Sequence, residues 1–520
     1  MRGLYKGTIP GAIYRTVLAL AMIWFAQTAV ASGTLASSAR LDDLDEARQF
    51  IEAGADFNLP EPDGTTPLLW AVYNMSPDLV SLLLDAGADP NIPNKLDITP
   101  LLQASRNGDA RIIAALLASG ARLDPQGLMT EPALLAAARS GNVDAVKLLL
   151  DAGANPNDTE PFEDQTALMW AAAEGHLEMV SALLDAGANP DMRARITSLT
   201  ERKNADFPSG GFAALHWAAR NGDEPMMSLL VDRGADINIR NGDESTPMML
   251  AIVNDRFDTA AQLLAMGADA NDGSLFYITE MRDATTDWRA RDGTIYRWDH
   301  NNELSAIDLT RMLLDAGADP NKPMQMQMHN TSMCCDTKVD STPFYRAAKA
   351  ADLAGMELML AHGADPNWKP ASETRPVGID GEEEIVSRSA LMMAITGGKG
   401  VGVAGGPNDL RNGPPDFREE GVRDPAGAVK LLLEAGADVN VLGPDSTTAL
   451  HVAVNALQPD IVRELVAYGA AMDARNDKDK TPLEMAEEMD PPMPRPGFYF
   501  EPPPAQPVEI VAILKELAGN

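Results

Sequence analysis

One short segment of the chain concentrates the side chains that soft metal ions prefer. It contains Met324, Met326, Met328, His329, Met333, Cys334 and Cys335. Thioethers and thiols are soft ligands, and alternate residues of an extended strand point to one side, so this segment could hold Cu(I). Methionine is also frequent elsewhere, at 26 residues, and commonly fills gaps between helices. We therefore interpret the segment first as a packing or adhesive loop, and keep copper handling or redox chemistry as the alternative.

No other pattern supports chemistry. A literal G-x-G-x-x-G occupies residues 400–405, but it follows a predicted helix, whereas a dinucleotide fingerprint must follow a strand and open a helix. Lys399 precedes Gly400 and not Ser or Thr, which excludes a phosphate-binding loop. The six histidines show no zinc spacing, and no nucleophile lies in a recognisable catalytic motif. We expect no enzyme activity, no catalytic residue and no cofactor.

The net charge and the cysteine content further limit which class of protein this chain can be. The net charge is −34, which repels nucleic acid phosphates and anionic lipid headgroups, so we expect no nucleic acid partner. Only two cysteines occur and they are adjacent, so no disulfide framework can stabilise the fold. Stability must come from packing.

The elements that position these residues follow from a recurring phrase. Leu-Leu-Asp-Ala-Gly-Ala-Asp-Pro-Asn at 83–91 returns with one change at 149–157. Its glycine recurs 33 or 34 residues apart in six of ten steps, at Gly54, Gly87, Gly120, Gly153, Gly187, Gly234, Gly267, Gly317, Gly363, Gly436 and Gly469. A second phrase, Thr-Pro-Leu, opens the units at 66–68, 99–101 and 481–483. Threonine caps a first helix, proline fits its first turn, and the glycine ends a second helix.

This pattern resembles the ankyrin repeat family, whose signature is T-P-L-H-x-A at a period of 33 residues. The resemblance extends over nearly all of 39–520 and implies an all-α ankyrin repeat solenoid of helix-turn-helix units with β-hairpin fingers. We expect about twelve repeats including caps, with an incomplete first unit whose helix covers 41–50 and a last helix at 508–517. It further implies a monomeric scaffold that binds a protein partner in the groove beside the first helices and fingers.

Long insertions interrupt the period. The finger is predicted to be lengthened at 192–210, 322–341 and 369–388, and the turn between the two helices at 283–303, 397–424 and 491–507. We divide the chain into a signal peptide (1–31), regular repeats with an N-terminal cap (32–191), repeats with insertions (192–440), and C-terminal repeats with a cap (441–520). The finger insertions adjoin the groove and are the better interaction candidates.

Two sets of residues are candidates for partner binding. The first lies near the end of successive first helices, where the family exposes variable residues to the groove; it comprises Tyr73, Arg106, Arg139, Arg220 and Lys349. The second is the basic loop with Arg193, Arg195, Arg202 and Lys203. Both favour an acidic protein partner, because arginine can bind carboxylates through two hydrogen bonds. The alternatives are ordinary ankyrin turns for the first set and a loop that folds back on the acidic protein for the second.

The N-terminus has the three parts of an export signal. Arg2, Lys6 and Arg15 precede an apolar run at 17–26, and Ala29-Val30-Ala31 provides the small residues that a signal peptidase requires. A run of about ten apolar residues is shorter than the roughly twenty needed to span a bilayer. We expect cleavage after Ala31, no membrane span in the mature chain, and a periplasmic or secreted ankyrin repeat protein of a bacterial type.

Overall fold

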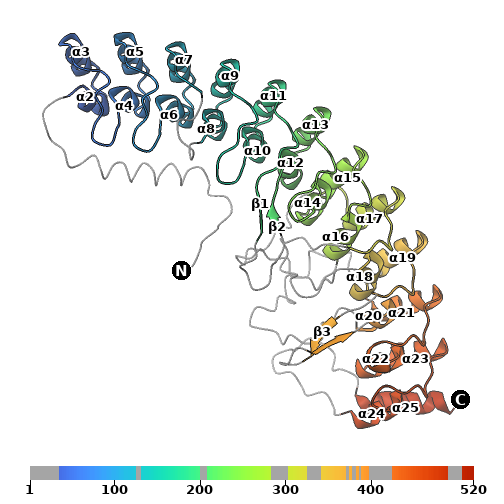
Figure 1. Cartoon of the computed structure of the whole chain (residues 1–520). Coiled ribbons are helices and arrows are strands. Elements are labelled where there is room, and N and C mark those ends of the chain that lie inside the picture. The colour runs from blue at the N-terminus through green and yellow to red at the C-terminus, as the bar shows by residue number, and fades with distance from the viewer. Residues whose placement is uncertain are drawn as a thin grey trace. The chain divides into compact units, whose positions relative to one another are not determined.

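The computed structural model describes residues 34–123, 131–198, 208–282, 302–324, 341–370, 374–377, 382–385, 388–396, 424–489 and 506–519. The chain divides into two compact units, Met1–Asn155 and Pro156–Asn520, which we call unit 1 and unit 2 and describe separately. In both units short helices follow one another in pairs (Figure 1).

The described residues of unit 1 form four helix pairs. They are α2 (Leu35–Leu41) with α3 (Leu44–Glu52), α4 (Pro67–Tyr73) with α5 (Pro77–Ala86), α6 (Pro100–Asn107) with α7 (Ala110–Ala118), and α8 (Ala133–Ser140) with α9 (Val143–Asp151). First helices pack against first helices of the next pair, and second helices against second helices. The sequence predicts an incomplete first unit with one helix at 41–50. The structure corrects this prediction, because α2 precedes α3 and the N-terminal repeat therefore has both helices.

Unit 2 contains eight helix pairs in its described residues. They are α10 (Ala167–Ala173) with α11 (Leu177–Asp185), α12 (Ala214–Asn221) with α13 (Glu224–Asp232), α14 (Pro247–Val253) with α15 (Phe257–Ala265), α16 (Ser274–Arg282) with α17 (Ala306–Asp315), α18 (Pro343–Ala350) with α19 (Leu353–Ala361), α20 (Ala390–Thr396) with α21 (Pro425–Glu434), α22 (Ala449–Asn455) with α23 (Pro459–Ala467), and α24 (Pro482–Glu488) with α25 (Pro507–Ala518). The described residues of both units thus form twelve pairs, which confirms the all-α repeat architecture and the predicted number of units.

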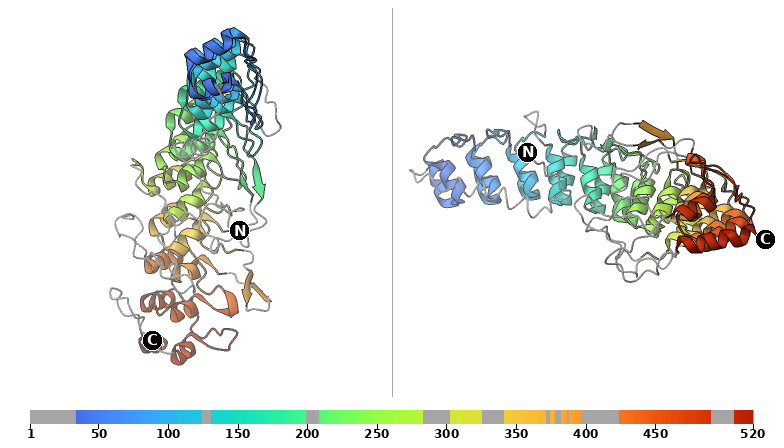
Figure 2. Two further views of the ribbon diagram at one scale, coloured as in Figure 1. Left: turned by 90° about the vertical axis from the view of Figure 1, so that its left-hand side faces the viewer. Right: turned by 90° about the horizontal axis from the view of Figure 1, so that it is seen from below.

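Two short hairpins are the only regular strands among the described residues. Strands β1 (Ile196–Ser198) and β2 (Pro208–Gly210) pair antiparallel between α11 and α12, and β3 (Thr374–Val377) and β4 (Glu382–Ile385) pair antiparallel between α19 and α20. Both project away from the helices (Figure 1 and Figure 2). The long insertions lie where the sequence places them, three of them between a second helix and the next first helix, and three between the helices of one pair.

The helix ends form as the two phrases predict. The Thr66 hydroxyl accepts a hydrogen bond from the Leu69 amide, and Pro67 occupies the first turn of α4, where a missing N–H is harmless. Gly87 ends α5 with a φ of 101°, a left-handed conformation that glycine adopts without a steric cost. First helices such as α4 are buried along most of their length because they pack between two neighbouring repeats.

Two histidines connect a first helix to the finger of the next repeat. His216 Nδ1 accepts a hydrogen bond of 3.0 Å from the Ala213 amide, and its Nε2 lies 3.2 Å from the Ser245 carbonyl oxygen. His451 makes the same two contacts, with Thr448 and with the Lys480 carbonyl. Because Nδ1 accepts, Nε2 carries the proton and donates it, so the ring is neutral. Burial lowers the pKa of His216 to about 4.

A ladder of asparagines joins consecutive repeats at the bend after six of the second helices in the described residues. The asparagine of the recurring phrase donates from Nδ2 to the glycine carbonyl of the next repeat and accepts from a nearby amide on Oδ1. In unit 1 Asn91 donates to Gly120 at 3.1 Å. The donors in unit 2 are Asn157, Asn271, Asn321, Asn367 and Asn440. The two partners lie 29 residues apart in one case and 69 in another, so insertions leave this ladder intact.

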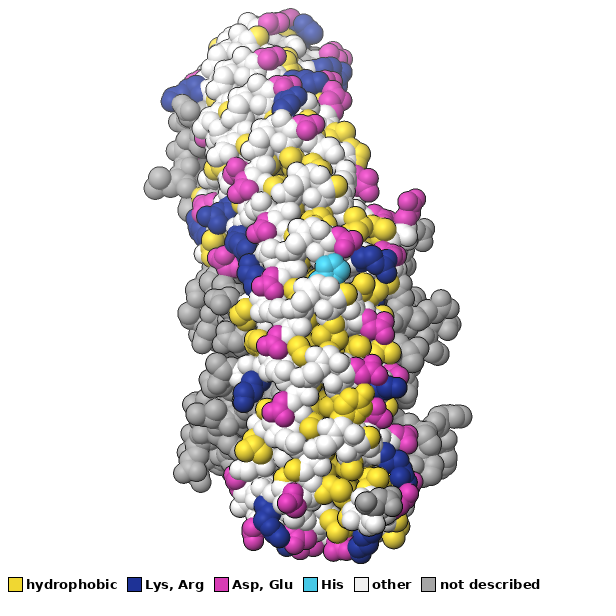
Figure 3. Space-filling model, turned by 90° about the vertical axis from the view of Figure 1, so that its right-hand side faces the viewer, with side chains coloured by type: hydrophobic (Ala, Val, Ile, Leu, Met, Phe, Trp, Pro, Cys, Tyr) yellow, Lys and Arg dark blue, Asp and Glu magenta, His cyan; other side chains and the backbone are white. Residues whose placement is uncertain are grey.

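The side on which the second helices lie carries mixed charge. Acidic and basic side chains are interspersed there, with apolar side chains between them (Figure 3). An ion pair joins Arg233 to Asp185 at 2.6 Å at the ends of two consecutive second helices, and the His362 imidazole lies 3.2 Å from Asp315 in the same arrangement. In the described part of the chain, no helix combines the length and the apolar character that a bilayer crossing requires. Residues 1–33, with the predicted signal, lie outside that part.

Candidate functional site

The fingers are joined to one another by backbone hydrogen bonds. In unit 1 the Lys95 amide donates to the Asp63 carbonyl at 3.0 Å. In unit 2 the equivalent donors are Arg195, Gly242 and Asp477, which bond to the carbonyls of Glu163, Gly210 and Asp445. Donor and acceptor are 32 residues apart in each case. Neighbouring fingers therefore form a ribbon whose tips are held in fixed positions.

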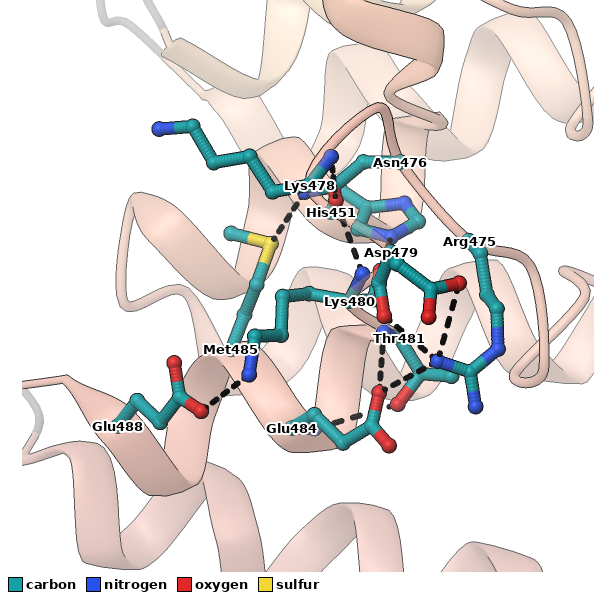
Figure 4. A network of polar contacts seen from close by, with 10 residues as sticks. All are labelled: His451, Arg475, Asn476, Lys478, Asp479, Lys480, Thr481, Glu484, Met485 and Glu488. Carbon is teal, nitrogen blue, oxygen red and sulfur yellow. Dashed lines mark hydrogen bonds and ion pairs between the residues drawn. The ribbon is translucent and has the colours of Figure 1, made fainter.

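The last finger shows how a complete finger is stabilised (Figure 4). The Asn476 side-chain oxygen accepts from the Lys478 and Lys480 amides, which closes the tip. Arg475 donates to the Asp479 carbonyl at 2.6 Å and to Glu484 Oε2 at 3.1 Å, and Glu484 also caps α24 by accepting from the Thr481 amide. The finger is thus held by its own residues and by the helix that follows it.

The first set of predicted partner-binding residues, which we call the basic stripe, is partly neutralised in unit 1. Arg139 donates to Glu131 Oε1 at 2.7 Å, and Arg106 lies 3.5 Å from Glu131 Oε2. The two arginines of adjacent repeats thus share one carboxylate. Tyr73 packs edge-on against Trp70, with ring centroids 5.8 Å apart. Asn107, which follows Arg106, donates to the Val72 carbonyl of the preceding repeat, as an ordinary structural turn would require.

In unit 2 the stripe residues are Arg220 and Lys349. The Arg220 guanidinium lies over the Trp217 ring, 5.4 Å from its centroid, and Trp217 in turn contacts Phe212. This is a cation–π contact, which leaves the guanidinium edge available to a carboxylate. Lys349 lies half-buried near the end of α18.

Two cations of the basic loop bind the protein itself. Arg195 donates to both carboxylate oxygens of Asp164, at 2.9 and 2.8 Å, and this hydrogen bonding raises the pKa of Arg195. Arg193 donates to the Arg240 carbonyl at 3.0 Å. Both contacts agree with the loop that folds back on the protein. The other two cations, Arg202 and Lys203, lie outside the described residues.

The predicted metal segment is described only at its first residue. Met324 packs beside Gly273, and its amide donates to the Ser341 carbonyl at 2.8 Å. Met326, Met328, His329, Met333, Cys334 and Cys335 lie outside the described residues, as does the glycine-rich run at 400–405. Elsewhere in the described part, no group of three or more His, Cys, Asp or Glu side chains is arranged to hold a metal ion. Copper binding stays a prediction.

One feature of unit 2 is not predicted from the sequence. The segment between the glycine that follows a second helix and the start of the next first helix has twelve residues in regular repeats, for example 88–99 and 235–246, but only six at 268–273. The repeat of α16 therefore lacks a fingertip. The spacing of the glycines does not reveal this loss, because the long insertion after α16 adds more residues than the short finger lacks. Counting from Gly267 to the next helix start would have found it.

A pocket of about 270 Å³ lies where that fingertip is missing. Its walls come from the preceding finger, from residues 270–276 and from residues 318–324, and it includes Met324. At its base the Thr246 hydroxyl donates to Asp272, which also accepts from the Ser274 amide at 2.7 Å. Burial raises the pKa of Asp272.

The comparisons with known proteins agree with this architecture. A family model described as ankyrin repeats (3 copies) matches residues 35–127, 101–194, 196–274 and 422–491, which together are more than half of the chain. The chain therefore belongs to the ankyrin repeat family. The third match ends at 274, where the short finger lies.

The curated relatives share only short segments with this chain. Protein fem-1 homolog C of Xenopus laevis is 41% identical over 58 residues, which are 11% of this chain and 9% of that protein. Protein phosphatase 1 regulatory subunit 27 of Mus musculus is 39% identical over 59 residues, which are 11% of this chain and 38% of that protein. The matches thus cover well under two thirds of either relative.

Solved ankyrin repeat domains are also similar. That of human ASB11 is 25% identical, with 42% of this chain and 92% of that chain covered and a TM-score of 0.36. That of Bcl-3 is 26% identical, with 45% and 98% covered and a TM-score of 0.37. Family membership supports a protein–protein interaction scaffold, since stacked ankyrin repeats offer extended binding surfaces.

Proposed function

We propose that this chain is an exported scaffold that binds a protein partner on its fingers and first helices. One observation carries the proposal: large apolar side chains are exposed at the fingertips. Half of the ten exposed large apolar side chains in the described residues lie on fingers, namely Leu59, Leu96, Phe162, Ile196 and Leu442. Exposed apolar groups mark interaction surfaces when they gather on a rigid support.

Two of these residues lie on neighbouring fingers of unit 2. Phe162 is 58% exposed and Ile196 is 45% exposed. Each is next in sequence to a residue of the hydrogen-bonded pair Glu163 and Arg195, which joins the two fingers at 2.6 Å. Together they offer a small apolar surface with a fixed geometry, and little conformational entropy is lost when a partner binds it.

Replacing Phe162 and Ile196 by serine is expected to reduce partner capture at least tenfold, because the apolar contact area is lost. The measurement is capture of proteins from an extracytoplasmic fraction by the immobilised chain, quantified for each specifically retained protein. Val508→Ser is the matched control, because Val508 is 74% exposed but lies on α25, away from the fingers. Unchanged capture by the serine double variant would contradict the proposal.

The acidic character of the partner is a finer proposal that rests on Arg220. Glu131 pairs with both Arg106 and Arg139. Replacing these two arginines by glutamate would place three carboxylates together, and would test the stability of the fold more than partner binding. Arg220→Gln in the same capture assay is the cleaner test. Arg139→Gln serves as its control, because Glu131 keeps Arg106 as a partner.

Export is proposed from the N-terminal signal pattern. Expression of the full chain in a bacterial host is expected to yield a mature protein whose first residue is Ser32, because cleavage follows Ala31. N-terminal sequencing and fractionation measure this outcome. Ala29→Arg, which removes a small residue before the cleavage point, should leave the precursor uncleaved. An uncleaved wild-type chain in the cytoplasm would reject the export proposal without affecting the scaffold function.

A further inference from the structure

The short finger of unit 2 leaves a gap in the finger ribbon. The preceding finger is bonded on one side through Gly242, whose amide donates to Gly210 at 2.9 Å. On its other side, the described part of the chain supplies residues 268–273 alone, which turn directly into α16. The pocket of about 270 Å³ occupies this place. Its walls belong to unit 2 throughout.

The floor of this pocket is apolar. It is formed by Met249, Leu275, Phe276, Met324 and Pro343, which come from three successive repeats. Met249, Leu275 and Phe276 are buried in the protein. Since a branched aliphatic side chain occupies on the order of 100 Å³, the space accepts one such side chain with its flanking backbone.

The rim of the pocket is acidic. It carries three carboxylates, Asp243, Glu244 and Asp319, and two cations, Arg240 and Lys322, while Asp272 lies at the base. Arg240 donates to the Glu244 carbonyl at 2.7 Å and lies 4.0 Å from the Glu244 carboxylate, and Lys322 donates to the Asn271 carbonyl at 2.5 Å. The rim therefore has a surplus of one negative charge and attracts cations.

We propose that an extended segment of a partner protein occupies this pocket in place of the missing fingertip, with an aliphatic side chain on the floor and a lysine or arginine beside the rim. This inference rests on the proposed scaffold function and names the chemistry of one partner segment. An extended backbone fits because the neighbouring fingers are themselves extended and pair through backbone hydrogen bonds, which is how added strands are bound.

Three labelled peptides test the inference on the full mature chain. They are Gly-Thr-Lys-Leu-Arg-Thr-Gly, a version with glutamates in place of Lys and Arg, and a version with alanine in place of Leu. We expect the first to bind at least tenfold more tightly than either of the others, measured by fluorescence anisotropy at low salt. Equal affinities for the three peptides would overturn the inference.

Two variants locate the binding at the pocket. Glu244→Lys reverses a rim charge and should weaken the first peptide at least fivefold. Asp479→Lys is the matched control, since Asp479 has the same place in its finger, and the two residues have similar φ angles of 55° and 62°. In a second variant, residues 235–246 replace 268–273 and restore the finger, which should abolish binding while native ellipticity is retained. Binding that survives in both variants would overturn the inference.

Two further outcomes distinguish a failure of this inference from a failure of the scaffold function, and test whether the chain's own insertion fills the pocket. In the first outcome, the finger-restored chain captures the partner fully and neither pocket variant changes peptide binding. This result would reject the pocket as a binding site and leave the fingertip surface valid. A chain with a Gly-Ser linker in place of 325–340 should bind the peptide as the intact chain does. A tenfold gain in that chain would show that its own insertion fills the pocket, and would also overturn the inference.

Discussion

Arg282→Met is expected to lower the free energy of unfolding of unit 2 by about 3 to 5 kcal/mol, which is the cost of leaving a buried charge without its partner. Arg282 lies at the end of α16 and donates to both carboxylate oxygens of Asp352, at 2.7 and 2.6 Å. Their side chains are only 3% and 5% exposed. Without the guanidinium, the Asp352 carboxylate would stay in a site that water does not reach.

Denaturant unfolding followed by ellipticity measures this loss. Repeats contact only their neighbours, so a weakened interface between α16 and α18 should also separate one transition into two. Asp352 accepts from the Gly355 amide and caps α19, and asparagine would keep that acceptor. The double variant with Asp352→Asn is therefore expected to regain most of the stability. Arg233→Met, which breaks an exposed ion pair with Asp185, is the control and should cost less than about 1 kcal/mol.

Acidification from pH 7 to pH 4 is expected to remove about 3 kcal/mol of stability through His216 alone. The pKa of His216 is lowered to about 4 in the folded chain, against 6.5 in the unfolded chain. Between these values the unfolded chain takes up a proton that the folded chain does not, so stability falls as pH falls. The contribution is complete above pH 6.5, and each pH unit below it costs about 1.4 kcal/mol.

A comparison with His216→Gln isolates this effect. The variant should be less stable at pH 7, and the difference in free energy of unfolding between the two proteins should shrink by about 3 kcal/mol towards pH 4. The other titratable groups are the same in both proteins, so their contributions to the pH dependence cancel in this difference. One of them is Asp272, whose contribution has the opposite sign, because burial raises its pKa and its protonation at low pH favours the folded state. A difference that does not change with pH would mean that the pKa of His216 is the same in the folded and the unfolded chain, and would contradict this prediction.

Much of the fold follows from local sequence, because each repeat forms its own caps and turns. Thr66, Pro67 and Gly87 predict where helices begin and end, and the insertions follow from the spacing of the glycines. Helix α2 was missed since Leu35–Leu41 contains two serines and no recurring phrase. Its capping box, between Thr34 and Ser37, was the one local signal.

The candidate site was less predictable, since it depends on partners far apart in sequence. The cations at 106 and 139 were identified from their repeat position, but nothing in that position shows that Glu131 lies between them. The pocket is lined by residues from three repeats. It arises from the short finger at 268–273, which the long insertion after α16 hides in the glycine spacing. The buried pair of Arg282 and Asp352 joins residues 70 positions apart and has no periodic signature.

The asparagine ladder also bears on how such a chain can be altered. Asn367 reaches the Gly436 carbonyl across 69 residues with the same side-chain contact that Asn91 makes across 29. The spacing of the scaffold is therefore independent of the length of chain inserted between its contacts. Peptides of foreign sequence grafted into 369–388 or 397–424 should be displayed without loss of helical order, which makes these positions natural sites for engineering new recognition loops.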